Sequence, residues 1–161
     1  MKYKDVSTGI SVADGQPART ELAKLADEGF EAVVNLREEG EADARMSPAE
    51  EGEAVSACGM SYLHVPFSLG DPAAASAAVD DFRREMSGIS GRVLVHCGSG
   101  RRAAALTAIH LGLKEGMRGE EVLAMARDCG CALEPPQLAD FVSTYVERNR
   151  GLYNKLEREI W

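Results

Sequence analysis

The sequence lacks a long apolar segment and an apolar start. No apolar run approaches the ~18 residues that a membrane-spanning helix needs. The first six residues, Met-Lys-Tyr-Lys-Asp-Val, are too polar for the beginning of a secretory signal. We therefore expect a cytoplasmic protein with no membrane partner.

Basic residues are also scarce, because 18 Lys and Arg face 26 Asp and Glu, a net charge of −8. Nucleic-acid binding needs basic charge clustered over a large face, and an acidic surface repels polyanions at long range. The composition therefore argues against a nucleic-acid partner. The pair Arg101-Arg102 is a local positive spot, which fits a small anion or one modified side chain.

Only four cysteines are present, and no two of them have Cys-x-x-Cys spacing: Cys58, Cys97, Cys129 and Cys131. A chain of 161 residues can build a core without disulfides, so reduced thiols are expected. The three histidines have no cysteine or carboxylate at metal-ligand spacing. We expect no metal or cofactor, and the question becomes which thiol is reactive.

Short apolar runs alternate with amphipathic segments along the chain. The runs predict strands at residues 8–12, 30–36, 61–65 and 92–96, and the segments between and after them predict helices at 19–28, 48–58, 72–87, 103–113, 120–127 and from 137. Strands separated by helices indicate an α/β fold with a mostly parallel central sheet of four or five strands, flanked by helices. We expect one domain over residues 1–161.

The segment around Cys97 contains most of the chemistry. A strand leads into His96-Cys-Gly-Ser-Gly-Arg-Arg102, and an Ala-rich helix follows. Gly98 and Gly100 permit a tight bend with inward-pointing amides, and the helix directs its positive end to the same point. Such surroundings favour the thiolate of Cys97, the form that acts as a nucleophile. Arg102 can hold two oxygens of a tetrahedral oxyanion. The alternative is that the segment is an ordinary glycine-rich turn from strand to helix, which contains Cys and Arg by chance.

Five segments occur together in the order typical of one family: Gly15-Gln-Pro17, Gly29-Phe30, Val33-Val-Asn-Leu-Arg37, Leu63-His-Val-Pro66 and Cys97-Gly-Ser-Gly-Arg-Arg102. Over roughly residues 10 to 125 the chain resembles the cysteine-dependent tyrosine and dual-specificity phosphatases, and in particular the bacterial DUF442, or beta-lactamase-hydrolase-like, group. The resemblance implies a phosphatase-like fold without metal. It implies Cys97 as nucleophile, Arg102 as phosphate clamp, and a phosphate-binding loop formed by Gly98, Ser99, Gly100, Arg101 and Ala103.

The chain departs from the tyrosine phosphatases at three places. Four residues separate Cys97 from Arg102, one fewer than in those enzymes, and the smaller ring resembles that of rhodaneses, which carry a persulfide. Ala103 stands where a Ser or Thr often assists the sulfur. Asp71 is available as a general acid, but Asp71-Pro72 is also a typical helix N-cap, and we favour the cap.

Three functions therefore remain open. The first is a hydrolase of phosphate monoesters, of phosphotyrosine type, that acts through a cysteinyl-phosphate on a small molecule or a phosphorylated protein. The second is a sulfur carrier with a persulfide on Cys97, and the third is a non-catalytic module that binds a phosphorylated ligand. The sequence does not predict an oligomeric state.

Neighbouring polar residues have less distinctive patterns. Strand alternation points His96 away from Cys97, so we expect it to orient the loop through hydrogen bonds. His64 is predicted to be a core residue. Arg37 either lines the same cleft or lies in a solvated loop, and the acidic run Glu38–Asp43 is interpreted as a solvated loop.

Overall fold

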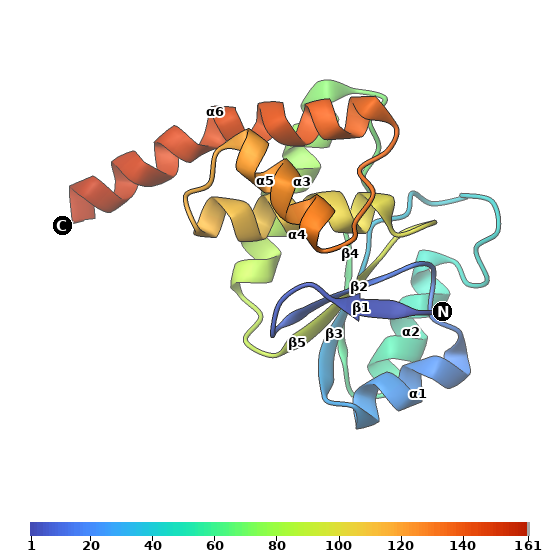
Figure 1. Cartoon of the computed structure of the whole chain (residues 1–161). Coiled ribbons are helices and arrows are strands. Elements are labelled where there is room, and N and C mark those ends of the chain that lie inside the picture. The colour runs from blue at the N-terminus through green and yellow to red at the C-terminus, as the bar shows by residue number, and fades with distance from the viewer. Residues whose placement is uncertain (161) are drawn as a thin grey trace. The chain divides into compact units, whose positions relative to one another are not determined.

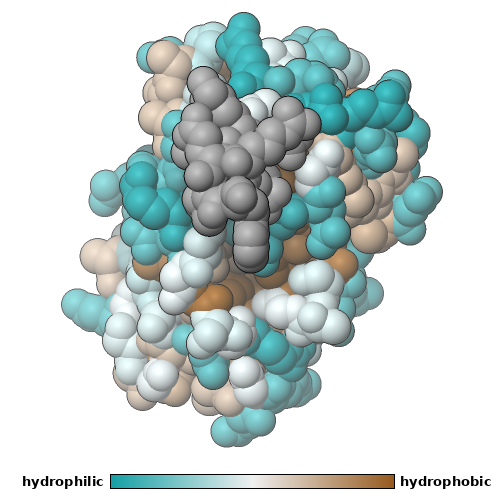
Figure 2. Space-filling model, turned by 90° about the vertical axis from the view of Figure 1, so that its left-hand side faces the viewer, coloured by the Kyte–Doolittle hydropathy of each residue, from teal (hydrophilic) through white to brown (hydrophobic). Residues whose placement is uncertain are grey.

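The computed structural model describes the backbone of residues 1–160 and the side chains of residues 1–151. The chain divides into two compact units, Met1–Ala103 and Ala104–Trp161. Each unit is described by itself below, and the expectation of one domain stays a prediction. Figure 1 shows the elements in chain order, and hydrophilic residues cover much of the face seen in Figure 2, as the net charge of −8 leads one to expect.

The first unit contains a five-stranded sheet with the strand order β1-β2-β5-β3-β4. Its strands are β1 (Tyr3–Asp5), β2 (Ile10–Ala13), β3 (Phe30–Asn35), β4 (Ser61–His64) and β5 (Arg92–His96). Only β1 is antiparallel to its neighbour, so the predicted α/β fold with a mostly parallel sheet is confirmed. The central strand β5 is a short apolar run buried on both faces, as a central parallel strand should be.

The N-terminal hairpin is where the strand predictions miss. The strand expected at residues 8–12 runs from Ile10 to Ala13, because Val6 N and Ser7 N both donate to Ile10 O and form the turn before it. Strand β1 was not predicted, since its sequence Tyr-Lys-Asp is polar and all three residues are exposed at the sheet edge.

Helices cover both faces of this sheet (Figure 1). Helices α1 (Arg19–Asp27) and α2 (Pro48–Ala57) lie on one face, and α3 (Pro72–Ser87) lies on the other. The predicted capping box of α2 is present, since Ser47 Oγ accepts from Glu50 N at 3.2 Å and the Glu50 carboxylate accepts from Ser47 N at 3.4 Å. Leu22, Val33 and Leu94 belong to the core between the sheet and α1–α2.

The second unit consists of helices. Helix α4 (Arg101–Lys114) begins at the end of the first unit, and α5 (Gly119–Asp128) packs on α6 (Pro136–Ile160). The contact of α5 with α6 requires glycine, because a Cβ on Gly119 would lie 2.6 Å from Ser143 Oγ. Glu147 Oε1 accepts from Gly119 N at 2.7 Å. None of the helices in the described part of the chain combines the length and the hydropathy that crossing a membrane requires.

Candidate active site

The loop between β5 and α4 has the bend that the glycines predict, for two different reasons. Gly100 has φ +90°, and a Cβ there would lie 3.0 Å from Ala13 O, so both its angle and its space favour glycine. Gly98 does not have a positive φ. A Cβ on Gly98 would lie 3.3 Å from Arg102 Nη2, so glycine keeps open the space beside the guanidinium.

Cys97 lies at the carboxyl end of β5 and is only 1% exposed. Its Sγ accepts hydrogen bonds from Gly100 N at 3.2 Å and from Ala103 N at 3.4 Å. Two backbone N–H groups at a helix start stabilise negative charge on the sulfur. Ala103 thus contributes through its amide, although its side chain has no hydroxyl.

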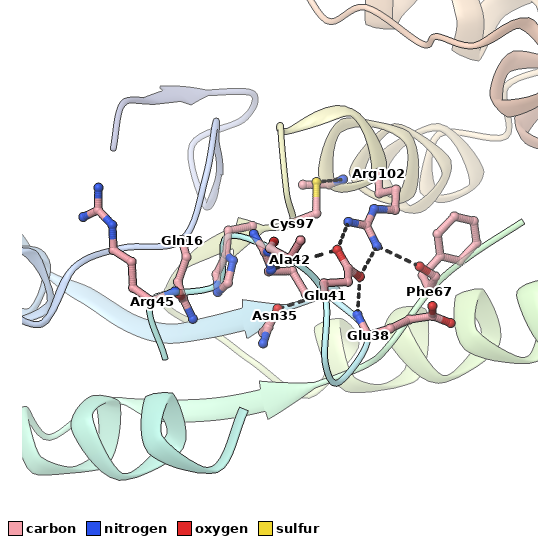
Figure 3. A network of polar contacts seen from close by, with 12 residues as sticks. Gln16, Asn35, Glu38, Glu41, Ala42, Arg45, Phe67, Cys97 and Arg102 are labelled. Atoms are coloured by element: carbon pink, nitrogen blue, oxygen red, sulfur yellow. Dashed lines mark hydrogen bonds and ion pairs between the residues drawn. The ribbon is translucent and has the colours of Figure 1, made fainter. Parts of the chain in front are cut away.

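Arg102 is held in place by the acidic segment after β3. Its Nη1 donates to Glu41 Oε2 at 2.8 Å and to Phe67 O at 3.1 Å, and its Nη2 donates to Glu41 Oε1 at 2.7 Å (Figure 3). These donated bonds hold the pKa of Glu41 below its usual value. The prediction that residues 38–43 form a merely solvated loop is therefore wrong at Glu41.

The remaining donors of Arg102 define what it can bind. A guanidinium has five N–H groups, and Glu41 and Phe67 accept from three of them. The Nε–H and one Nη2–H remain, and these two lie on the same edge of the planar group. The Glu41 carboxylate raises the pKa of Arg102 most, and the sulfur of Cys97 raises it further. The second fork of Arg102 is thus left for an oxyanion beside Cys97.

Arg37 lies beside the same loop and is only 6% exposed. Its Nη1 is 3.9 Å from the point where a Cβ on Gly98 would stand, and its Nη2 donates to Ala42 O at 2.6 Å. Asn35 Oδ1 accepts from Arg37 N at 2.8 Å, and the His64 ring bonds Arg37 O at 2.7 Å. Of the two alternatives for Arg37, the solvated loop is wrong because the side chain is buried, and the shared cleft stays a prediction.

The predicted role of His64 as a core residue is wrong in part, because the side chain is half-buried and its ring bonds the backbone of Arg37. His96 is fully buried, and its Nε2 lies 2.7 and 2.8 Å from the two oxygens of Glu51, which is also fully buried. His96 thus makes hydrogen bonds, as expected, but to α2, and its role in orienting the loop stays a prediction. Its partner on α2 was not predicted.

Gln16 connects this buried pair to the acidic segment. Its Nε2 donates to Glu51 Oε2 at 3.3 Å and to Met46 O at 3.1 Å. Its Oε1 accepts from Arg45 N at 2.8 Å and from Met46 N at 3.1 Å. One amide therefore ties the segment that carries Glu41 to the helix that holds His96.

Asp71 is the N-cap of α3, since its Oδ1 accepts from Ala73 N at 3.0 Å and the residue is exposed. The N-cap alternative is confirmed, and a role as general acid stays a prediction. Ser99 and Arg101 are exposed, and their part in phosphate binding also stays a prediction.

Among the described residues, no three His, Cys, Asp or Glu side chains are grouped for a metal ion.

A mostly parallel sheet, a cysteine at the end of its central strand, a glycine bend and an arginine at the start of the next helix define a fold of the tyrosine-phosphatase-like class. The family model "Beta-lactamase hydrolase-like protein, phosphatase-like domain" matches residues 2–139. The chain belongs to this family, as the resemblance in its sequence predicted.

Curated relatives agree with this assignment. The beta-lactamase hydrolase-like protein of Xylella fastidiosa (strain Temecula1) is 32% identical over 130 residues, which are 81% of this chain and 30% of the relative. The Agrobacterium fabrum protein of the same description is 31% identical over 106 residues, 66% of this chain and 24% of the relative. The chain thus spans less than a third of the length of these relatives.

Solved structures confirm the fold. A candidate phosphatase (DUF442) of Shewanella putrefaciens has a TM-score of 0.69 and 24% identity, with 89% of this chain and 87% of that chain covered. A candidate phosphatase of Neisseria meningitidis has a TM-score of 0.70 and 19% identity, with 88% and 96% covered.

Proposed function

We propose that the protein is a phosphatase that hydrolyses phosphate monoesters through a cysteinyl-phosphate on Cys97. The observation that carries the proposal is the convergence of donors on one sulfur. Gly100 N and Ala103 N donate to Cys97 Sγ, and the free fork of Arg102 lies beside it. The relatives described as phosphatases support the same class of substrate.

In the first step, the Cys97 thiolate attacks phosphorus, an S–P bond forms, and the bond from phosphorus to the leaving oxygen breaks. Arg102 and the amides of residues 98–103 hold the phosphoryl oxygens, where charge accumulates in the transition state. In the second step, water attacks phosphorus, a P–O bond forms, the S–P bond breaks, inorganic phosphate is released, and the thiolate is regenerated.

The leaving oxygen must gain a proton in the first step, and Asp71 is the proposed donor. Asp71 is exposed and caps α3, so it protonates the leaving group only if substrate reaches that helix start. Proton transfer contributes about 10²–10⁴-fold to such reactions. Where that proton is not supplied, aryl phosphates with good leaving groups should react much faster than alkyl phosphates.

Hydrolysis of p-nitrophenyl phosphate tests the proposal. Cys97→Ser should abolish turnover, and Arg102→Lys should reduce it strongly, since a single ammonium cannot form a fork. Cys58→Ser is the matched control, because Cys58 is a half-buried thiol at the end of α2. Full activity of Cys97→Ser would refute the proposal.

Persulfide transfer is a second candidate function, favoured by the short spacing from Cys97 to Arg102. Here the Cys97 thiolate attacks the outer sulfur of thiosulfate, an S–S bond forms, and sulfite leaves. Cyanide then takes the outer sulfur as thiocyanate. Thiocyanate formation that depends on Cys97, without phosphate release, would establish this function. Tight phosphate or vanadate binding without either turnover would indicate a binding module.

The proposed chemistry requires a reduced thiol. All four cysteines are free, which fits the predicted cytoplasmic location. The proposed substrates are phosphate monoesters, on a small molecule or a phosphorylated protein, and no nucleic-acid or membrane partner is proposed.

A further inference from the structure

The Arg37 side chain has donors that its surroundings do not use. In the described part of the chain its guanidinium makes one hydrogen bond, from Nη2 to Ala42 O. Its Nε is buried without a hydrogen-bond partner, and the nearest carboxylate oxygen, Oε1 of Glu41, lies at 4.0 Å. Keeping donors of a charged group unpaired in a buried place costs stability, so the donors of Arg37 that lack a hydrogen bond call for an acceptor.

The unused donors of Arg37 adjoin the reaction centre. Arg102 Nη2 and Arg37 Nη1 lie 3.3 and 3.9 Å from the same point, the position that a Cβ on Gly98 would take. Glu41 Oε1 is also 3.9 Å from that point, but both oxygens of this carboxylate already accept from Arg102. Glu41 therefore forms a close bidentate pair with Arg102, whereas its ion pair with Arg37 is long, 4.0 Å from Oε1 to Nε.

Space for a ligand group exists beside Arg37. A cavity of about 210 Å³ lies on one side of Arg37; Glu38, Glu41 and residues of the segment that leads to α2 also line it, and no residue of the Cys97 loop does. This volume suits a small group. The net charge of −8 also disfavours large polyanions.

We infer that Arg37 and Arg102 form a two-guanidinium subsite at the mouth of the Cys97 loop, and that the ligand is a small molecule with a second oxyanion near its phosphate. Arg102 and the loop amides hold the phosphate, while Nη1 of Arg37 binds the second group. The inference rests on the proposed function, because it assumes that phosphate occupies the Cys97 loop.

Binding to the Cys97→Ser protein tests the subsite without turnover. Isothermal titration should show that phosphoglycolate, which has a phosphate and a carboxylate, binds about 10-fold more tightly than ethyl phosphate. Equal affinities would overturn the subsite and leave the proposed function intact. Failure of both compounds to bind would instead overturn the proposed function.

The residue assignment is tested by Arg37→Met in the same background, which should remove the preference for phosphoglycolate. Arg45→Met is the matched control, since it makes the same change of charge on an exposed side chain that points away from Cys97 (Figure 3). A preference that survives Arg37→Met overturns the assignment. If that variant does not fold, Arg37→Lys serves instead: it keeps the charge, loses the planar donors and should reduce the preference.

Discussion

Neutralising Glu41 should damage the site without touching any atom that reacts. Glu41→Gln keeps the size of the side chain, but its amide nitrogen would face one of the Nη groups that now donate to a carboxylate. Arg102 would lose the bidentate pair that holds the end of its guanidinium, and would keep the Phe67 carbonyl and a single amide oxygen as acceptors. The free fork would then no longer be directed beside Cys97.

The magnitude follows from the number and burial of these bonds. A hydrogen bond to a charged group is worth about 1.5–3 kcal/mol. Both side chains are 24% exposed, so water compensates part of the loss. A net loss of about 1.4–3 kcal/mol corresponds to a fall in kcat/KM of about 10- to 100-fold.

Steady-state hydrolysis of p-nitrophenyl phosphate measures this effect, and Glu39→Gln is the control because it removes the same charge from an exposed neighbour. Glu41→Ala offers a second readout. It leaves a carboxylate-sized gap, and added formate should restore part of the activity. Higher activity of Glu41→Gln, together with tighter phosphate binding, would show that Glu41 competes with substrate and would refute a positioning role.

Three further predictions concern stability. Glu51→Ala should destabilise the fold by about 3–5 kcal/mol in urea unfolding, because His96 would lose its buried partner; an unchanged midpoint would show that the pair contributes nothing. Gly100→Ala should lower the melting temperature more than Gly98→Ala, since only Gly100 has a positive φ. The folded-state pKa of Glu41 is lowered, so its ion pair stabilises the protein fully above the usual value of 4.5 and loses this effect as pH falls through the lowered value. The difference in unfolding free energy between wild type and Glu41→Gln should therefore shrink below about pH 4.5, and a constant difference would contradict this.

The local features of the fold could be predicted from the sequence because each depends on neighbours in the chain. The caps at Ser47 and Asp71 lie within three residues of their partners, and the Cys97 bend follows from two glycines after an apolar strand. The partners of the site residues could not be predicted in this way. Glu41 is 61 residues from Arg102, and nothing in an acidic run distinguishes the member that meets an arginine.

One missed residue did leave a signal. Glu51 is four residues before Val55, and residues at this spacing share a face of a helix. Val55 is the apolar residue that α2 buries, so its spacing from Glu51 indicates that this carboxylate is buried as well, as it is in the structure. A buried carboxylate needs donors, and the sequence offered His96 at the end of the central strand as one of few buried candidates.

Residues outside the short ring from Cys97 to Arg102 help to position its side chains. Two loop amides donate to the sulfur, whereas the acceptors that hold the Arg102 guanidinium, Glu41 and Phe67, lie outside the loop. Other connections of the sheet therefore contribute, since Glu41 follows β3 and Gln16 follows β2. Gln16 fixes the segment that bears Glu41, and Glu41 fixes Arg102. Gln16→Ala should therefore weaken catalysis through Arg102 although Gln16 does not contact it, and kinetics additive with Glu41→Gln would refute this coupling.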